Sequence, residues 1–170
     1  MVEAMPVAAR LNALGFDCFC LNYRTAVPES FVSGLMPQPL DDLADALHLI
    51  AENRTVFDVD PMQYLLFGFS AGGHLASLWG TCALGARHYG IPQPLLLALA
   101  YPLISMAQYP ASPVRDYLCK GLFGSDYSSE QLNRYDAGKN MDAGYPKTFL
   151  VRALDDSTVP PDNAAEFLRA

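Results

Sequence analysis

The sequence predicts an α/β protein with a mainly parallel sheet and helices on both faces. Short apolar runs of strand length alternate with longer segments in which apolar residues recur every three or four positions, as on one helix face. The run 95–101 is apolar at nearly every position, which is typical of a strand covered on both sides. Such alternation is the pattern of a parallel sheet wrapped by helices. The 170 residues contain no repeat and no linker, so we predict a single domain.

The first half of the chain predicts two helices and one strand. Residues 5–14 place Val7, Ala8, Leu11 and Leu14 on one helical face, and Gly15 ends that helix. A strand follows at 16–22, and residues 25–39, rich in proline and serine, form a long surface connection. A second helix begins at Pro39 and ends near Asn53; its apolar stripe consists of Leu40, Leu43, Leu47 and Ile50.

The second half predicts three strands, each followed by a helix. The turn 58–61 leads into an apolar strand at 64–69, and the next helix runs to about Leu84, burying Leu75, Leu78, Trp79 and Cys82. After the strand at 95–101, a short helix at 116–123 ends at Gly124. Residues 125–145 are polar and irregular. The last strand lies at 147–153, and another helix begins at Pro161.

The composition excludes several classes of protein. Hydrophobic residues make up 51% of the chain, enough for a sizeable core. The net charge of -7, without any run of Lys or Arg, argues against nucleic acid or an anionic membrane as the main partner. No apolar stretch has membrane-spanning length, and the first residues lack the features of a signal peptide. We therefore predict a soluble, cytoplasmic protein.

The four cysteines predict no metal site and no disulfide framework. Cys18, Cys20, Cys82 and Cys119 lack the spacing that either would need. Cys18 and Cys20 lie two apart in a predicted strand, share one face, and are expected to be small core residues. No metal or cofactor is predicted.

The most informative motif is Gly68-Phe69-Ser70-Ala71-Gly72, between the strand at 64–69 and the following helix. A sharp strand-to-helix turn lifts a serine hydroxyl clear of the sheet, and its neighbours must then be small, as Gly68 and Gly72 are. We therefore predict a nucleophile elbow with Ser70 as the nucleophile. The N–H of Ala71 would point at the oxyanion of an acyl-transfer intermediate, aided by the helix dipole. The alternative is an ordinary turn serine.

A candidate acid follows the last predicted strand. Catalytic groups in parallel sheets lie at the carboxyl ends of the strands, where Asp155 and Asp156 are found. Either carboxylate could orient a histidine base. The alternative is that the pair caps a loop or the next helix.

Several further segments carry a family resemblance. The elbow motif continues as Gly73-His74-Leu75-Ala76, and the other matching segments are Asn22-Tyr23-Arg24, Asp60-Pro61, 101–105, 146–150 and 155–160. Together they resemble the α/β-hydrolase carboxylesterases, nearest to the acetyl-xylan-esterase-like and feruloyl-esterase-like group. The resemblance implies an α/β-hydrolase fold, Ser70 as nucleophile, and Ala71 as one oxyanion donor. It also implies Asp156 as the triad acid, with Asp155 as the second choice.

The chain departs from this family in two ways. The His-Gly-Gly loop that supplies the second oxyanion donor precedes the segment resembling 7–24 in family members, and the chain starts too late to contain it. The family order is Ser, acid, His, but His48, His74 and His88 all precede Asp156. His74 lies one turn into the helix that leads away from Ser70, so it is expected to be a packing or supporting residue; the alternative is that it serves as the base. We therefore predict a fold that is incomplete at both ends. In family members the strand that carries the His-Gly-Gly loop lies between the strands that resemble 16–22 and 64–69. Without it, these two strands either leave a slot between them or close up and pair with each other.

Two functions are consistent with these observations. The first is a carboxylesterase that cleaves short-acyl, acetyl-like esters, including acylated carbohydrate, by a Ser-His-Asp mechanism whose His is absent from this chain. The second is a catalytically inactive hydrolase remnant that binds a ligand or partner, or a truncated gene product. In the second case the missing strands would expose apolar surface, which favours oligomers or aggregation.

Overall fold

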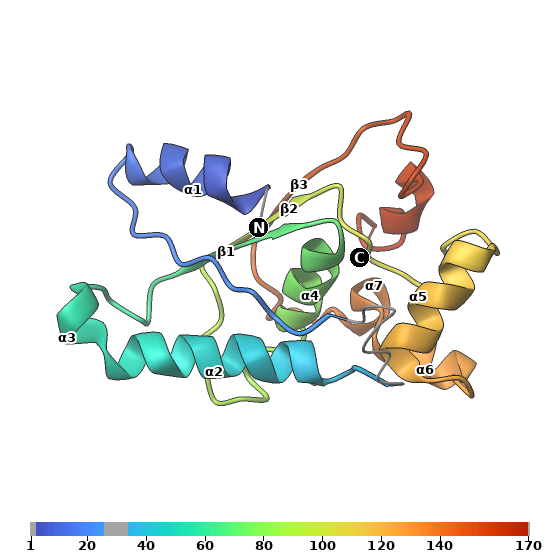
Figure 1. The fold of residues 1–170 in the computed structure, drawn as a ribbon, viewed down its shortest axis with the longest axis horizontal. Coiled ribbons are helices and arrows are strands. Elements are labelled where there is room, and N and C mark those ends of the chain that lie inside the picture. Colours follow the sequence, from blue (N-terminus) through green and yellow to red (C-terminus); the bar gives the residue numbers. More distant parts are fainter. Residues whose placement is uncertain (1–2, 26–33, 170) are drawn as a thin grey trace.

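Three parallel strands form the sheet in the part of the chain that the structure describes. The structure is a computed structural model that describes residues 3–25 and 34–169. Its strands are β1 (Leu65–Phe69), β2 (Leu96–Ala100) and β3 (Thr148–Val151), in the order β1-β2-β3. In register, Phe67 lies opposite Ala98 and Ala98 opposite Phe149. The predicted parallel α/β arrangement is therefore confirmed (Figure 1).

Helices lie on both sides of this sheet, but they cover the two faces unequally. In Figure 1, α1 (Ala4–Asn12) lies on one side, and α2 (Gln38–Glu52) and α4 (Ala71–Trp79) lie on the other. Under α4, Leu97 and Leu99 of β2 are fully buried. The opposite face exposes Phe67, Phe149 and Val151. The prediction that 95–101 is covered on both faces is therefore wrong for one of them.

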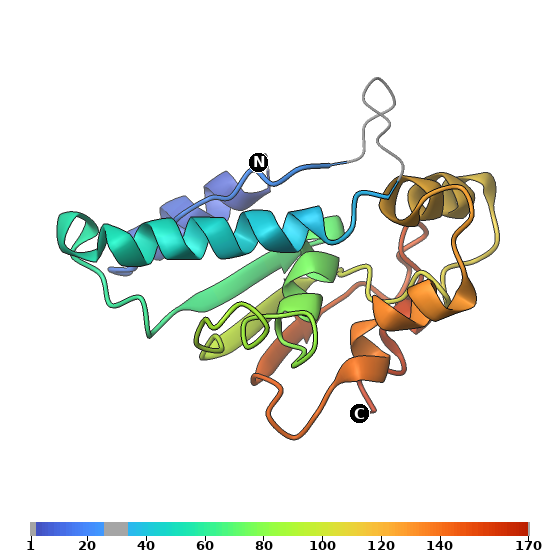
Figure 2. The same cartoon turned by 90° about the horizontal axis from the view of Figure 1, so that it is seen from below.

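The remaining helices lie beyond the sheet. α3 (Arg54–Phe57) is at one end of the molecule, while α5 (Pro113–Phe123), α6 (Ser129–Arg134) and α7 (Ala137–Asn140) gather at the other (Figure 2). A 3₁₀ turn at Pro161–Ala164 stands where the sequence predicts a helix. None of the helices in 3–25 and 34–169 is long and apolar enough to cross a membrane.

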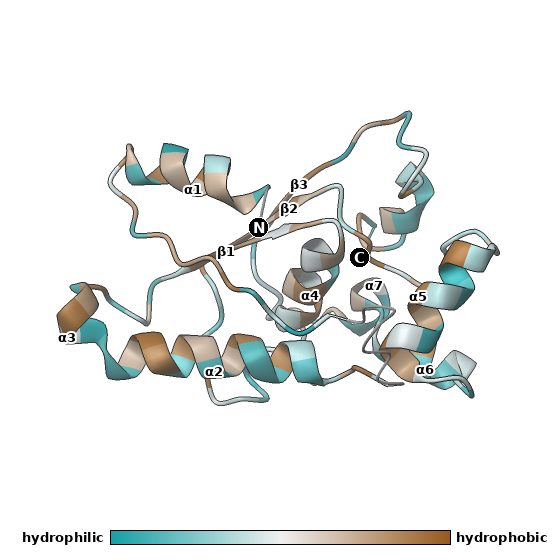
Figure 3. Cartoon of the chain, viewed as in Figure 1, coloured by the Kyte–Doolittle hydropathy of each residue, from teal (hydrophilic) through white to brown (hydrophobic). Residues whose placement is uncertain are grey.

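The core is centred on α4, which packs on β1 and β2. Trp79, the only tryptophan, is fully buried; its Nε1–H donates to the Tyr64 hydroxyl at 2.9 Å, and its ring stacks on Tyr89. Leu40 of α2 and Leu78 of α4 are also fully buried. Figure 3 shows apolar colour along the strands and mixed colour on the surrounding helices. This packing fixes α4, and thus the turn at its N-terminus, relative to the sheet.

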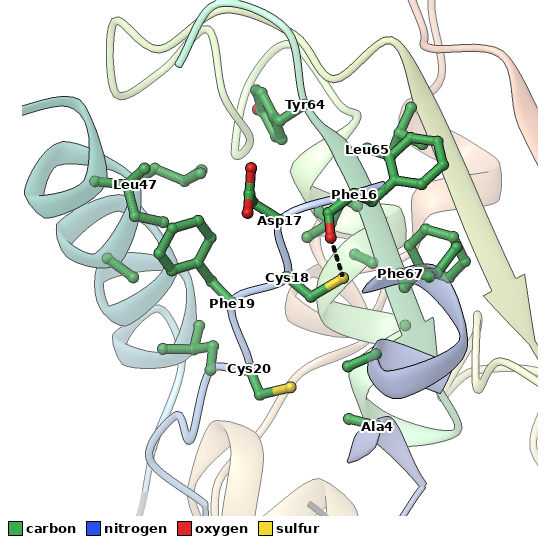
Figure 4. A pocket seen from close by; sticks show the side chains of 18 of the residues that line it. Ala4, Phe16, Asp17, Cys18, Phe19, Cys20, Leu47, Tyr64, Leu65 and Phe67 are labelled. Atoms are coloured by element: carbon green, nitrogen blue, oxygen red, sulfur yellow. Dashed lines mark hydrogen bonds between the residues drawn. The ribbon is translucent and has the colours of Figure 1, made fainter. Parts of the chain in front are cut away.

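The predicted strand at 16–22 does not form. Within the described part of the chain, this segment pairs with no strand, and a cavity of about 750 Å³ lies between it, α2 and β1 (Figure 4). A strand needs a neighbour for its backbone groups, and here a cavity lies where the pairing with β1 would be. Of the two arrangements expected for these strands, the structure shows the slot.

The two cysteines of this segment are not core residues. Phe19 points toward Leu47 of α2, whereas the sulfur atoms of Cys18 and Cys20 point the other way (Figure 4). Cys20 is exposed and Cys18 is half-buried. Because the segment borders a cavity and not a neighbouring strand, the core prediction for this pair is wrong.

The helix after Ser70 is shorter than predicted. It ends at Trp79, because the chain folds back at once and the Ala86 N–H donates to the Trp79 carbonyl at 3.0 Å. A Cβ on Gly85 would stand 1.8 Å from that carbonyl oxygen, so only glycine permits this approach. Cys82 consequently lies in an exposed turn and is not buried as predicted.

The other predicted helices agree with the structure more closely. Those expected at 5–14, 39–53 and 116–123 correspond to α1, α2 and α5. Gly124 ends α5 with a φ of 95°. The stretch 125–145, expected to be irregular, contains α6 and α7. Part of the predicted connection 25–39 lies outside the described residues.

Candidate functional site

Ser70 occupies the turn between β1 and α4 in an uncommon backbone conformation. Its φ of 49° and ψ of -114° lie in a region that residues other than glycine rarely adopt. Its N–H donates to the Ala100 carbonyl at 3.1 Å. Its carbonyl accepts from the N–H groups of Leu103 (3.1 Å) and His74 (3.2 Å). The end of β2 and the first turn of α4 together hold the serine in place.

The glycines beside Ser70 differ in how strictly the fold requires them. A Cβ on Gly68 would meet the Gly72 carbonyl oxygen at 2.3 Å, and one on Gly73 would meet the Pro102 Cβ at 2.6 Å. A Cβ on Gly72 meets only the Tyr23 hydroxyl, at 3.6 Å. Gly68 and Gly73 thus allow β1, α4 and the segment after β2 to approach closely.

Ala71 is the first residue of α4 and is exposed. The first N–H groups of a helix have no acceptor within the helix, and the helix dipole places partial positive charge there. Ser70 is half-buried. An anionic oxygen beside Ser70 can therefore meet an N–H donor at this end of α4.

His74 is buried, and of its two ring nitrogens only Nδ1 has a hydrogen-bond partner in the described structure. Its ring Nδ1 lies 3.0 Å from the Leu103 carbonyl, so Nδ1 carries the proton that this bond needs. Burial lowers the pKa of His74 to about 4, opposed by hydrogen bonds to the backbone. His74 is therefore a neutral imidazole that packs in the core, as predicted.

The other two histidines are exposed. His48 lies on α2, and His88 lies in the turn after α4 with its ring edge-on to Tyr89. Within the described residues, none of the three imidazoles hydrogen-bonds to Ser70, Asp155 or Asp156.

Asp156 lies in the loop after β3, at the same edge of the sheet as Ser70, because parallel strands end together. Its Oδ1 accepts from the N–H groups of Thr158 (2.8 Å) and Val159 (2.9 Å), which leaves Oδ2 without a partner in the described structure. Asp155 is exposed. Asp156 therefore caps its own loop and also presents a free oxygen in a fixed orientation.

A buried polar cluster near this edge escaped the sequence analysis. It consists of Asn163 in the 3₁₀ turn, Ser105 after β2, and Asp136 before α7, each at most 2% exposed. The Asn163 side chain hydrogen-bonds to the backbone of Ser105, and the Ser105 hydroxyl donates to the Asp136 carboxylate. The described residues hold no group of three or more His, Cys, Asp or Glu side chains arranged to bind a metal.

A family model described as BD-FAE matches residues 2–88, which is half of the chain. The chain belongs to the BD-FAE family. It is similar to endo-1,4-beta-xylanase B of Butyrivibrio fibrisolvens, with 28% identity over 92% of this chain and 25% of the relative. It is also similar to the acetylxylan esterase of Xylanibacter ruminicola, with 26% identity over 88% of this chain and 29% of the relative.

Solved structures show the fold to which this BD-FAE chain belongs. The acetyl ester-xyloside bifunctional hydrolase of Caldicellulosiruptor lactoaceticus superposes with a TM-score of 0.77 at 31% identity, over 96% of this chain and 59% of that one. A lipase/esterase from Lactobacillus plantarum gives a TM-score of 0.79 at 22% identity, over 98% and 64%. The chain thus spans about three-fifths of its solved relatives and is part of an α/β-hydrolase fold, in the predicted esterase group.

Proposed function

We propose that this BD-FAE chain carries the nucleophile and the acid of a serine carboxylesterase that acts on short-acyl, acetyl-like esters, including acylated carbohydrate. The observation that carries the proposal is the backbone of Ser70, held at a positive φ between β1 and α4. Strain of this kind concentrates at functional sites. The names of the relatives, an acetylxylan esterase and an acetyl ester-xyloside hydrolase, support the substrate class.

In the proposed reaction the Ser70 Oγ attacks the carbonyl carbon of the ester and its proton passes to an imidazole base. The Ala71 N–H donates to the resulting oxyanion. Collapse of the intermediate breaks the ester C–O bond, and the alcohol leaves with the proton from the imidazolium. Water, activated by the same imidazole, then hydrolyses the acyl-serine and releases the carboxylic acid.

Asp156 is proposed to orient the imidazole through its free Oδ2. The base itself is proposed to come from outside the three histidines of the chain, because His74 is buried and makes no hydrogen bond to Ser70, and His48 and His88 are exposed on other elements. Loss of the base lowers turnover by about 10⁴- to 10⁶-fold, so we expect the 170-residue chain to be a very weak catalyst.

The test is hydrolysis of a chromogenic acetate ester by the 170-residue chain and its Ser70→Ala variant, with and without added imidazole. We expect negligible turnover without imidazole and a rate increment with imidazole that disappears in Ser70→Ala. Asp156→Asn should reduce this increment, whereas Asp155→Asn, the matched control, should leave it unchanged.

Two outcomes would contradict the proposal. Fast, Ser70-dependent turnover without imidazole would show that one of the three histidines is the base. Equal rates for the chain and Ser70→Ala under all conditions would instead favour the alternative function, a catalytically inactive hydrolase relative that binds a ligand or a partner.

A further inference from the structure

Asn163 hydrogen-bonds with all of its polar side-chain atoms to one short segment after β2. Its Oδ1 accepts from the N–H groups of Ile104 (2.7 Å) and Ser105 (3.1 Å). Its Nδ2 donates to the Ser105 carbonyl at 2.6 Å. The side chain is 2% exposed, so no water competes for these bonds. Only an amide offers both an acceptor and a donor in this shape.

The same segment contacts the serine turn from its other side. The Leu103 N–H donates to the Ser70 carbonyl at 3.1 Å, and the Leu103 carbonyl accepts from His74 Nδ1 at 3.0 Å. Three consecutive residues, 103–105, therefore connect the backbone of Ser70 to Asn163.

Asn163 is in turn tied to the loop that carries Asp156. Its N–H donates to the Pro160 carbonyl at 2.9 Å. The Tyr109 hydroxyl donates to the Thr158 carbonyl at 2.7 Å, and the Arg152 guanidinium donates to the Pro161 carbonyl. With the bonds from Asp156 to its own loop, these contacts restrain the whole stretch 156–163.

Ser105 is supported by a third element. Its hydroxyl donates to Asp136 Oδ2 and accepts from the Gln108 N–H at 3.2 Å. Asp136 is 1% exposed and precedes α7. Burial raises the pKa of the Asp136 carboxyl, and the Ser105 hydroxyl opposes that rise. The segment 103–105 is thus held from α4, from α7 and from the 3₁₀ turn.

We propose that Asn163 is a positioning residue that fixes the Asp156 loop against the Ser70 turn, with Ser105 and Asp136 bracing the connection. The inference rests on the proposed function, since a nucleophile and an acid that share one imidazole must keep a constant separation. An error of about 1 Å in such a geometry costs up to about 100-fold in rate.

The test compares Asn163→Ala and Asn163→Asp with a control, Thr81→Val, in the full 170-residue chain. Thr81 is fully buried and its side-chain hydroxyl donates only to the nearby Leu78 carbonyl, so its substitution reports general loss of stability. The first readout is amide hydrogen exchange at Ile104, Ser105 and residues 155–159. We expect faster exchange in both segments of Asn163→Ala, a smaller effect in Asn163→Asp, which keeps the acceptor, and none in Thr81→Val.

The second readout is the imidazole-assisted, Ser70-dependent turnover of an acetate ester, measured in a double-mutant cycle with Asp156→Asn. We expect Asn163→Ala to lower kcat about 10- to 100-fold with little change in KM. It should cause no further loss when Asp156→Asn is already present. If Asn163→Ala does not fold, the double-mutant cycle with Asp156→Asn is measured with Asn163→Asp instead.

The outcomes separate this inference from the proposed function. Unchanged exchange at Ile104 and Ser105, or losses that add to those of Asp156→Asn, would overturn the positioning role. Absence of any imidazole-assisted, Ser70-dependent turnover in the unsubstituted chain would overturn the proposed function itself.

Discussion

Gly68 and Gly72 flank Ser70 symmetrically in sequence but are not equivalent in structure. We expect Gly68→Ala to destabilise the chain by about 3 kcal/mol or to prevent it from folding, since overpacking costs about 1–3 kcal/mol. The new Cβ would meet the Gly72 carbonyl oxygen at 2.3 Å. Gly72→Ala, the matched control, should remain within about 1 kcal/mol. Chemical denaturation measures both. Equal losses in the two variants would show that the close approach of β1 and α4 at Gly68 is not what the fold requires.

His74 makes the stability of the chain depend on pH. Its pKa is about 4 in the folded chain, lowered by burial from 6.5. The unfolded chain binds the proton first as the pH falls, so stability is complete above pH 6.5 and is lost toward pH 4, by at most roughly 3 kcal/mol. His74→Asn keeps a donor for the Leu103 carbonyl and should flatten this dependence. Parallel pH profiles of thermal unfolding for both proteins would contradict the expectation.

At the level of single residues, only side chains whose role is evident from neighbouring residues can be predicted from the sequence. Ser70 stands in a Gly-x-Ser-x-Gly motif, and Asp156 follows the last strand, so both are recognisable from their neighbours in the sequence. Asn163 is not, because the groups that it binds lie 58 and 59 residues away. Only the packing of the 3₁₀ turn on the segment after β2 brings them together.

Helices α1, α2 and α5 could be predicted because their signals lie within each helix. Apolar periodicity and a following glycine define α1 and α5. The signal for α6 was also present, since Ser128 and Gln131 form a capping box. The length of α4 could not be predicted, because the fold-back onto Trp79 that ends it is a tertiary contact.

The strand predicted at 16–22 shows the limit of such patterns for sheets. Its apolar composition is that of a strand, but a strand exists only when another strand pairs with it. Here a cavity lies between this segment and β1. Prediction of β structure therefore depends on neighbours that the local sequence does not specify.

At the scale of the whole molecule, α1 covers one face of the described sheet only in part. Phe67, Ala98 and Phe149 are in register and therefore point to the same side, and Phe67, Phe149 and Val151 are exposed there. Contiguous apolar surface of this kind promotes association. We expect the chain to self-associate at micromolar concentration in sedimentation velocity, and Phe149→Thr to reduce that association.

The control for this prediction is Leu154→Thr. Leu154 is 85% exposed, but it lies in the loop after β3 and not on the sheet. It should leave association unchanged. A monomeric chain at all concentrations, or an equal effect of both substitutions, would show that this partly covered sheet face is not the contact.

The single tryptophan is a natural optical reporter for this fold. Trp79 is sealed at the end of the helix that begins beside Ser70, with Tyr64 and Tyr89 against it. Its emission should be shifted to short wavelength in the native chain and move to the red on unfolding. Because the chain has no second tryptophan, the emission of Trp79 reports whether the core around α4 is folded, without an added label.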